Sequence, residues 1–283
     1  MSASDAQQAA PASGVSAGLV SLVGAGPGDP ELLTMKAVRR LAEAHVVLYD
    51  TLVPLEVLAL APRASCFCVG KRAGGRGVPQ PTINRLLISL ANRGKRVVRL
   101  KCGDPFVLGR GGEEAMAVAS AGIRVDIVPG ITTAIAAPAL AGIPVTHRGL
   151  SSGFVVISGH AEDAYLRTIA SIAPGSLTLV ILMGIATKRA LVARLLGCGW
   201  DAATPAAVLL AASTPRAFTW TGPLVELAAV SLEACGNDPG TIVIGPVIGI
   251  RASLVAPHQA MARPMSVADR RAESVKATNG PNA

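Results

Sequence analysis

The stretch RVVRLKCGDPFVLGRGGEE, residues 96–114, begins as an aliphatic and basic strand and then breaks into a glycine-containing turn. The turn is Cys102-Gly103-Asp104-Pro105, and a second glycine cluster follows before two glutamates. A short apolar run that stops at Gly and Pro and leads into a helical pattern is typical of a parallel strand with its crossover helix. We therefore predict a strand over 96–101 and a helix over 111–121.

The same alternation recurs on both sides of this stretch. Further strands are predicted at 18–24, 45–50, 65–70 and 123–128, with helices at 31–44, 54–61, 81–93 and 131–141. After 142–152, which changes character, strands are predicted at 154–159, 177–184, 206–212, 218–222 and 241–250, with helices near 164–172, 187–197 and 223–235. The fold class expected is α/β, with two α/β domains whose sheets are mostly parallel or mixed.

The expected boundaries follow from the same pattern. They are a disordered leader at 1–18, an N-terminal α/β domain at 19–145, a linker at 146–152, a C-terminal α/β domain at 153–253 and a flexible tail at 254–283. The 283 residues are 51% hydrophobic but only 3% aromatic, so the cores must be aliphatic. No apolar run reaches about 18 residues, and the N-terminus has no basic region before an apolar one. We expect a cytoplasmic protein that does not act on a membrane.

Charge and cysteines narrow the classes of ligand. The net charge is +8, and the surplus lies in residues 1–150, which carry 16 basic and 10 acidic groups. The basic run 93–101 fits a solvated face, a nucleic-acid face or the attraction of a polyanionic small substrate, although the scarcity of aromatics argues against nucleic-acid stacking. The five cysteines include no C-x-x-C pair, so we expect reduced cysteines that serve as small buried hydrophobic residues, and no metal site.

Polar and glycine-rich segments follow the first four predicted strands. They are GAGPGD (24–29), Asp50, Gly70-Lys71-Arg72 and Cys102-Gly103-Asp104-Pro105. In an open parallel sheet such segments meet at the carboxyl edge, where ligands bind. The third glycine of the first loop comes one position early for a dinucleotide fingerprint, and Pro27 removes a backbone donor. A ligand without a phosphate fits this edge better.

A series of longer motifs resembles a known family. GAGPGDPELLT, LYDTLV, VGKRAG, VPQPTIN, RLKCGDPFVLGRGGEE, VPGITTA, AGIPVTHRG, SGH and LMG occur in the order seen in uroporphyrinogen-III C-methyltransferases, a branch of the tetrapyrrole methylases. The resemblance spans about residues 19–250. It implies a homodimer of two-domain chains with the active site in the interdomain cleft. It also implies transfer of methyl groups from S-adenosylmethionine, which becomes S-adenosylhomocysteine, to C-2 and C-7 of uroporphyrinogen III. The product, precorrin-2, is the branch point to sirohaem, cobalamin or haem d1.

The resemblance also implies roles for individual residues. Those of the cofactor site are Pro27, Cys102, Gly103, Asp104, Val107, Thr132, Thr133, Met183 and Ala212. Asp50 and Lys71 match the family's proton acceptor and donor, and Arg110 would assist electrostatically or in proton transfer. Glu113, Arg148 and His160 would lie around the macrocycle. No metal is implied.

Each charged candidate also has a plainer interpretation. Asp50 and Lys71 could form an ordinary ion pair at the sheet edge, and Glu113 could stabilise a helix N-terminus. Arg148 could be a solvated linker cation and His160 an exposed loop histidine.

Five positions depart from the family pattern. They are Cys102, Leu108, Leu182, Ala212 and Ala217, which stand where the family usually has glycine, an aromatic residue, tyrosine, glycine and glutamine. At Cys102 a left-handed backbone would be strained by roughly 1–2 kcal/mol, so we predict a negative φ there. The freedom of glycine would then be needed at Gly103 alone.

Two other function classes remain open from the sequence. One is a tetrapyrrole methylase that acts on a later corrinoid or on ribosomal RNA, and the other is a non-catalytic cofactor-binding protein, which the departures from the family pattern would suit. A small-molecule tetrapyrrole, rather than nucleic acid, is the substrate expected here.

Overall fold

The computed structural model describes residues 18–70, 77–232 and 235–255. Their contacts form two compact units. The first holds the described residues up to Gly130 except Pro27–Asp29, and the second holds Pro27–Asp29 together with the residues from Ile131 onward.

The first unit is built on a five-stranded, fully parallel sheet in the order β3-β2-β4-β1-β5. Its strands are β1 (Leu19–Gly24), β2 (Val46–Tyr49), β3 (Ser65–Cys68), β4 (Arg96–Lys101) and β5 (Arg124–Val128). The carboxyl ends of all five strands therefore lie at one edge, as the sequence predicted.

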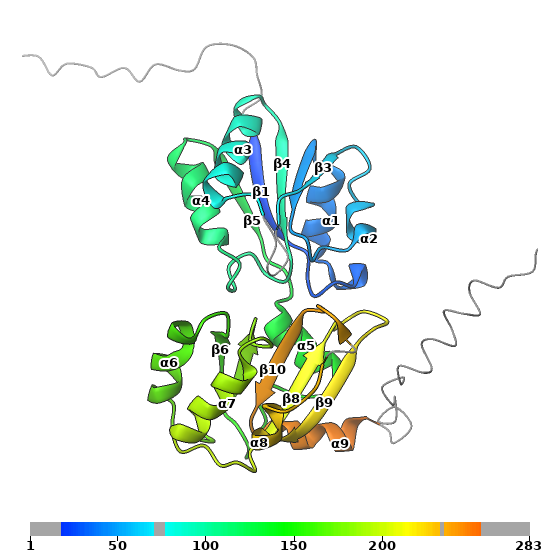
Figure 1. Cartoon of the computed structure of the whole chain (residues 1–283). Coiled ribbons are helices and arrows are strands. Elements are labelled where there is room, and N and C mark those ends of the chain that lie inside the picture. Colours follow the sequence, from blue (N-terminus) through cyan, green and yellow to red (C-terminus); the bar gives the residue numbers. More distant parts are fainter. Residues whose placement is uncertain (1–17, 71–76, 233–234, 256–283) are drawn as a thin grey trace, which may run out of the picture. The chain divides into compact units, whose positions relative to one another are not determined.

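Helices cover both faces of this sheet (Figure 1). A short 3-10 turn, η1 (Pro30–Leu32), precedes α1 (Met35–Ala42), which packs with α2 (Leu55–Leu58) on one face. The other face carries α3 (Gln80–Asn92) and α4 (Gly111–Ser120). Along β4, Val98 and Leu100 pack in the apolar core under α1 and α2, whereas Val97 packs in the core under α3 and α4. Because side chains alternate along a strand, Arg99 and Lys101 point to the face that α3 and α4 cover.

The second unit has a mixed sheet in the order β6-β7-β10-β8-β9. Only β6 and β7 are parallel, and the other three pairings are antiparallel. Its elements are α5 (Thr133–Leu140), β6 (Phe154–Ser158), α6 (Glu162–Ser171), β7 (Thr178–Leu182), α7 (Lys188–Gly197), β8 (Pro205–Leu210), β9 (Phe218–Pro223), α8 (Leu224–Leu227), β10 (Gly240–Ile244), η3 (Pro246–Ile250) and α9 (Arg251–Leu254).

The second sheet is also covered on both faces. Tyr165 of α6, Leu191 of α7 and Leu224 of α8 pack on one face, in a cluster that also contains Trp200. Ala137 of α5 and Val247 of η3 pack on the other. The α/β class with one parallel and one mixed sheet agrees with the prediction.

The structure differs from the predicted elements near the C-terminal end. The strand predicted over 241–250 ends at Ile244, because Gly245 has a φ of 147° and Pro246 begins η3. Among the described residues of the helix predicted over 223–235, the α-helical ones are those of α8 at 224–227, and α9 was not predicted.

The compact units divide at Gly130–Ile131, earlier than the domain boundary expected at 145. The reason is that Ala137 of α5 and Ile143 pack against Ala207 and Val243 of the second sheet. The leader and tail lie outside the described residues, except for Gly18, Leu254 and Val255. Within the described ranges, no helix is long and apolar enough to cross a bilayer.

Candidate functional site

Three glycine loops meet backbone to backbone at the carboxyl edge of the first sheet. Gly26 and Gly103 form a two-way bridge, with N···O distances of 3.2 and 2.7 Å. A Cβ added to Gly24 would lie 2.5 Å from the Gly103 carbonyl oxygen and 2.5 Å from the Gly130 nitrogen, and one added to Gly130 would lie 2.3 Å from that same oxygen. Glycine at 24 and 130 is therefore what allows the GAGPG, CGD and PG loops to approach one another.

Asp104 ties two of these loops together. Its Oδ1 accepts a hydrogen bond from the Phe106 backbone N–H at 2.8 Å, and its Oδ2 accepts one from the Gly130 N–H at 3.1 Å. The carboxylate thus shapes the edge, whatever else it contacts. Val107 follows in the same turn, with its N–H directed to the Asp104 carbonyl oxygen at 3.4 Å.

The backbone at Cys102 agrees with the prediction. Cys102 is absent from the non-glycine residues with positive φ, whereas Gly103 has a φ of 67°. The half-buried Cys102 thiol donates to the Gly26 carbonyl oxygen at 3.8 Å. The cysteine is therefore accommodated because its glycine neighbour adopts the left-handed conformation.

Arg110 and Glu113 form an exposed pair at the start of α4. Arg110 Nε and an Arg110 terminal nitrogen donate to the two carboxylate oxygens of Glu113 at 2.9 and 2.7 Å. This hydrogen-bonded contact lowers the pKa of Glu113 and raises that of Arg110. Both side chains remain more than half exposed, at 58% and 56%, so the pair is open to a ligand.

Glu114, the next residue, is fully buried and belongs to a charge network that the sequence analysis missed. Its Oε1 accepts from Arg99 Nε at 2.9 Å, and its Oε2 lies 3.3 Å from Lys101 Nζ. Arg99 also binds Asp50 Oδ1 at 2.5 Å, and Lys101 Nζ lies 3.5 Å from Asp50 Oδ2. Two cations of the basic run 93–101 are therefore buried and paired, which excludes them from a solvated or nucleic-acid face. The other residue proposed to act with Asp50, Lys71, lies outside the described residues.

The second unit gathers its predicted residues at one edge of the mixed sheet. Strand β10 pairs Thr241 with both Leu182 of β7 and Leu209 of β8, and β6 pairs Ser158 with Leu182. The segments that follow β6, β7 and β8 therefore share an edge. They contain His160, Met183 and Ala212.

Backbone strain marks these strand ends in both units. The non-glycine residues with positive φ in the described ranges are Leu108, Arg110, Met183, Ala211 and Ser213. All five follow β4, β7 or β8, and such outliers cluster at ligand sites. Ala212 is not among them, so alanine at this position requires no left-handed backbone.

The remaining cofactor candidates lie in the second unit. Thr132 is the N-cap of α5, where its Oγ1 accepts from the Ala134 N–H at 3.3 Å, and Thr133 begins that helix. Pro27 belongs to the short segment Pro27–Asp29, which groups with this unit, and the Asp29 N–H donates to Ser213 Oγ at 3.1 Å.

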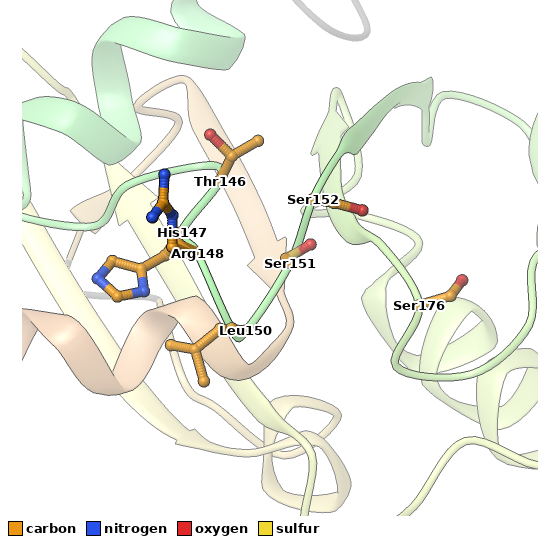
Figure 2. A pocket seen from close by; sticks show the side chains of 8 residues that line it. Thr146, His147, Arg148, Leu150, Ser151, Ser152 and Ser176 are labelled. Carbon is orange, nitrogen blue, oxygen red and sulfur yellow. The ribbon is translucent and has the colours of Figure 1, made fainter.

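Arg148 is not brought together with His160. It lies in a tight turn closed by the bridge between His147 and Ser151, just before β6, whereas His160 follows the other end of that strand. The turn borders a hollow of about 560 Å³ that Ser152 and Ser176 also line (Figure 2). Arg148 and His160 are both exposed. In the described part of the chain, no group of three or more His, Cys, Asp or Glu residues is arranged to hold a metal ion.

Comparison with known proteins identifies the family. Residues 19–228 match the model of the tetrapyrrole (corrin/porphyrin) methylases. A siroheme synthase 2 of Aeromonas hydrophila is 47% identical over 239 residues, which are 84% of this chain and 50% of that protein. A siroheme synthase of Pseudomonas aeruginosa is 44% identical over 243 residues, 85% of this chain and 52% of that protein. The chain thus spans about half the length of the curated relatives it matches.

One solved structure matches this chain over almost its own whole length. The uroporphyrin-III C-methyltransferase from Thermus thermophilus, in complex with S-adenosylhomocysteine, is 42% identical with a TM-score of 0.70. The match covers 82% of this chain and 99% of that one. With the glycine loops and strained strand ends described above, these matches show that the chain belongs to the tetrapyrrole methylase family.

Proposed function

We propose that this chain is a uroporphyrinogen-III C-methyltransferase that uses S-adenosylmethionine to methylate C-2 and C-7 and forms precorrin-2. The observation that carries the proposal is the edge of the first sheet, where three backbone-lined loops meet next to the carboxylate of Asp50. The similarity to the Thermus thermophilus enzyme over 99% of that chain supports it.

The first unit suits a zwitterionic cofactor better than a nucleotide phosphate. The loops at its edge are joined backbone to backbone at Gly26 and Gly103 and carry few side chains, and Pro27 lacks the N–H that a phosphate cradle would use. Small residues allow such a ligand to approach bare backbone. When bound, S-adenosylmethionine supplies an electrophilic methyl group. The residues proposed to hold it are those that the family motifs indicate: Pro27, Cys102, Gly103, Asp104, Val107, Thr132, Thr133, Met183 and Ala212.

Asp50 is proposed to accept the proton that the macrocycle loses when a ring carbon gains a methyl group. Its side chain is 27% exposed, so the carboxylate is accessible from the sheet edge although both of its oxygens have cationic partners. Proton transfer by a positioned group contributes about 10²- to 10⁴-fold to a rate. Lys71 is proposed as the donor in the later proton shift.

Exposed cations are proposed to bind the carboxylates of the substrate. Arg110 presents a guanidinium that is already engaged with one carboxylate, Glu113, and can exchange it for another of the same geometry. Arg148 and His160 are proposed to contact the macrocycle as well. Because they lie at opposite ends of β6, they would contact different parts of the bound substrate or act in different steps.

We further propose a cytoplasmic homodimer that binds neither a membrane nor nucleic acid and needs no metal. Burial of Arg99 and Lys101 removes two cations from any nucleic-acid surface and so disfavours a ribosomal RNA substrate. Light scattering coupled to gel filtration would test the dimer. A methyl-transfer rate that changes little between 50 and 200 mM salt would argue against an RNA substrate, since RNA binding weakens steeply with salt.

The decisive test is product identification. The protein is incubated anaerobically with labelled S-adenosylmethionine and uroporphyrinogen III, and the product is analysed by mass. We expect two added methyl groups. Absence of a dimethylated product from a protein that binds S-adenosylhomocysteine in calorimetry would refute the proposal.

The role of Asp50 needs a separate measurement. Asp50→Asn should lower kcat by about 10²- to 10⁴-fold and leave S-adenosylhomocysteine affinity within threefold of wild type. Asp126→Asn is a matched control, because this variant also removes a carboxylate that has two cationic partners. Asp126 lies within strand β5 rather than at the carboxyl end of a strand. Unchanged turnover in Asp50→Asn would show that Asp50 is not the proton acceptor.

A further inference from the structure

Four charged residues form a closed network at the carboxyl edge of the first sheet. Arg99 and Lys101 of β4 each contact both Asp50 and Glu114, at the distances given above. Gln80 of α3 donates to Glu114 Oε1 at 2.9 Å. The network therefore joins β4 to the end of β2 and to the helices α3 and α4, and its charges sum to zero.

The members differ sharply in exposure. The side chains of Arg99, Lys101 and Glu114 are 3%, 5% and 0% exposed, whereas that of Asp50 is 27% exposed. Of these four, only Asp50 presents a substantial surface to a ligand. Three buried charges thus support one accessible carboxylate.

Stability alone does not account for this arrangement. Removing charged groups from water is unfavourable, and well-packed apolar residues of similar volume often stabilise a protein as much as a buried ion network does. What the network adds is orientation. Asp50 Oδ1 is bound by Arg99 and Oδ2 is approached by Lys101, so rotation of the carboxylate would break one contact or the other.

Glu114 fixes the two cations from the opposite side. Its Oε1 binds Arg99 Nε, while the Arg99 NH1 donates to the Leu48 and Leu100 carbonyl oxygens at 3.4 and 3.2 Å. These hydrogen bonds fix the plane of the Arg99 guanidinium, whose other terminal nitrogen binds Asp50. Glu114 follows Glu113 directly in the chain, yet Glu114 is buried in this network whereas Glu113 is exposed beside Arg110.

We propose that Arg99, Lys101 and Glu114 are positioning residues that hold the Asp50 carboxylate in the orientation needed for proton transfer. This inference rests on the proposed function, in which Asp50 accepts a proton from the methylated macrocycle. Glu114 acts on the reaction only through the cations and Asp50.

Two variants of the full chain test the inference. Glu114→Gln keeps the shape of the side chain and removes its charge. Arg99→Lys keeps the net charge but replaces the planar fork, which bonds in several directions at once, by a single ammonium. We expect each to lower kcat at least tenfold, with the KM for uroporphyrinogen III and the Kd for S-adenosylhomocysteine within threefold of wild type. If Glu114→Gln fails to fold, Arg99→Lys carries the same test.

A double variant separates positioning from a purely structural role. In an Asp50→Asn background, adding Arg99→Lys should cause no further loss of kcat, because the group it orients is already absent. The control Asp126→Asn breaks the ion pairs with Lys36 and Arg40. It should lower the melting temperature but leave kcat unchanged at temperatures where the variant is folded.

The outcomes distinguish the two levels of the proposal. If Asp50→Asn itself keeps wild-type turnover, the proposed role of Asp50 fails and the inference falls with it. If Asp50→Asn loses turnover but Arg99→Lys and Glu114→Gln keep wild-type kcat, or if the losses multiply in the double variant, the positioning inference is overturned while the proposed function stands.

Discussion

Replacing Gly24 by alanine should damage the ligand edge of the first sheet directly. An added Cβ would lie 2.5 Å from the Gly103 carbonyl oxygen and 2.5 Å from the Gly130 nitrogen, and both are backbone atoms that cannot move without their loops. Overpacking of this kind costs about 1–3 kcal/mol, and loss of the two Gly26–Gly103 hydrogen bonds would add about 1 kcal/mol each.

We therefore expect a loss of stability of about 3–5 kcal/mol, which corresponds to a fall in melting temperature of roughly 6 to 20 °C. Since the displaced loop carries Cys102 and Gly103, S-adenosylhomocysteine should also bind at least tenfold more weakly. Differential scanning fluorimetry and titration calorimetry measure the two effects.

A matched control is available in the same unit. A Cβ added to Gly112 in α4 meets nothing within 4 Å, so Gly112→Ala should be neutral or stabilise the protein by up to about 1 kcal/mol. A Gly24→Ala protein that melts and binds S-adenosylhomocysteine like wild type would refute the account of the three loops.

The other predictions concern the loop, the surface cations and acid stability. Gly103→Ala should weaken S-adenosylhomocysteine binding more than Cys102→Gly does, because only Gly103 has a positive φ; calorimetry giving the reverse order would contradict this. Arg110→Ala and Arg148→Ala should each weaken porphyrinogen binding by about 1.5–3 kcal/mol with cofactor affinity little changed, and equal losses of both affinities would indicate a structural role instead. Burial opposes ionisation of Asp126, but hydrogen bonds from its two basic partners outweigh it and hold the pKa of this carboxyl below its usual value. The stability it contributes is thus present above the unfolded-state pKa and is lost as the pH falls through the lower, folded-state pKa. In urea unfolding, the free energy of unfolding of Asp126→Asn should fall less below about pH 4 than that of wild type. An equal fall in both proteins would contradict the pairing of Asp126 with Lys36 and Arg40.

Local patterns predicted the elements of the first unit closely. β4 over 96–101 was predicted from its aliphatic run and the following Gly and Pro, because turn chemistry and strand periodicity are properties of neighbouring residues. Short segments were predicted less well. The run 241–250 reads as one apolar strand, but a glycine and a proline at 245–246 end the strand and begin η3.

Burial of charge could not be read from the same patterns. Arg99 and Lys101 belong to a basic run, which usually marks a solvated face. Their burial depends on Glu114 and Asp50, which lie 15 and 49 positions from Arg99 in the chain. Similarly, the motif gave no indication that Glu113 is exposed and Glu114 buried, because that depends on which side of α4 packs on the sheet.

By itself the sequence determined the α/β class, the run of parallel strands, the single edge where their glycine loops meet and the family whose motifs occur there, since these follow from local periodicity and from residues next to each strand end. Only the tertiary structure decided which charges pair and that Gly24 and Gly130 flank Gly103 at backbone contact. These features join residues distant in the chain. Their geometry depends on sheet order and helix packing, which local sequence patterns do not encode.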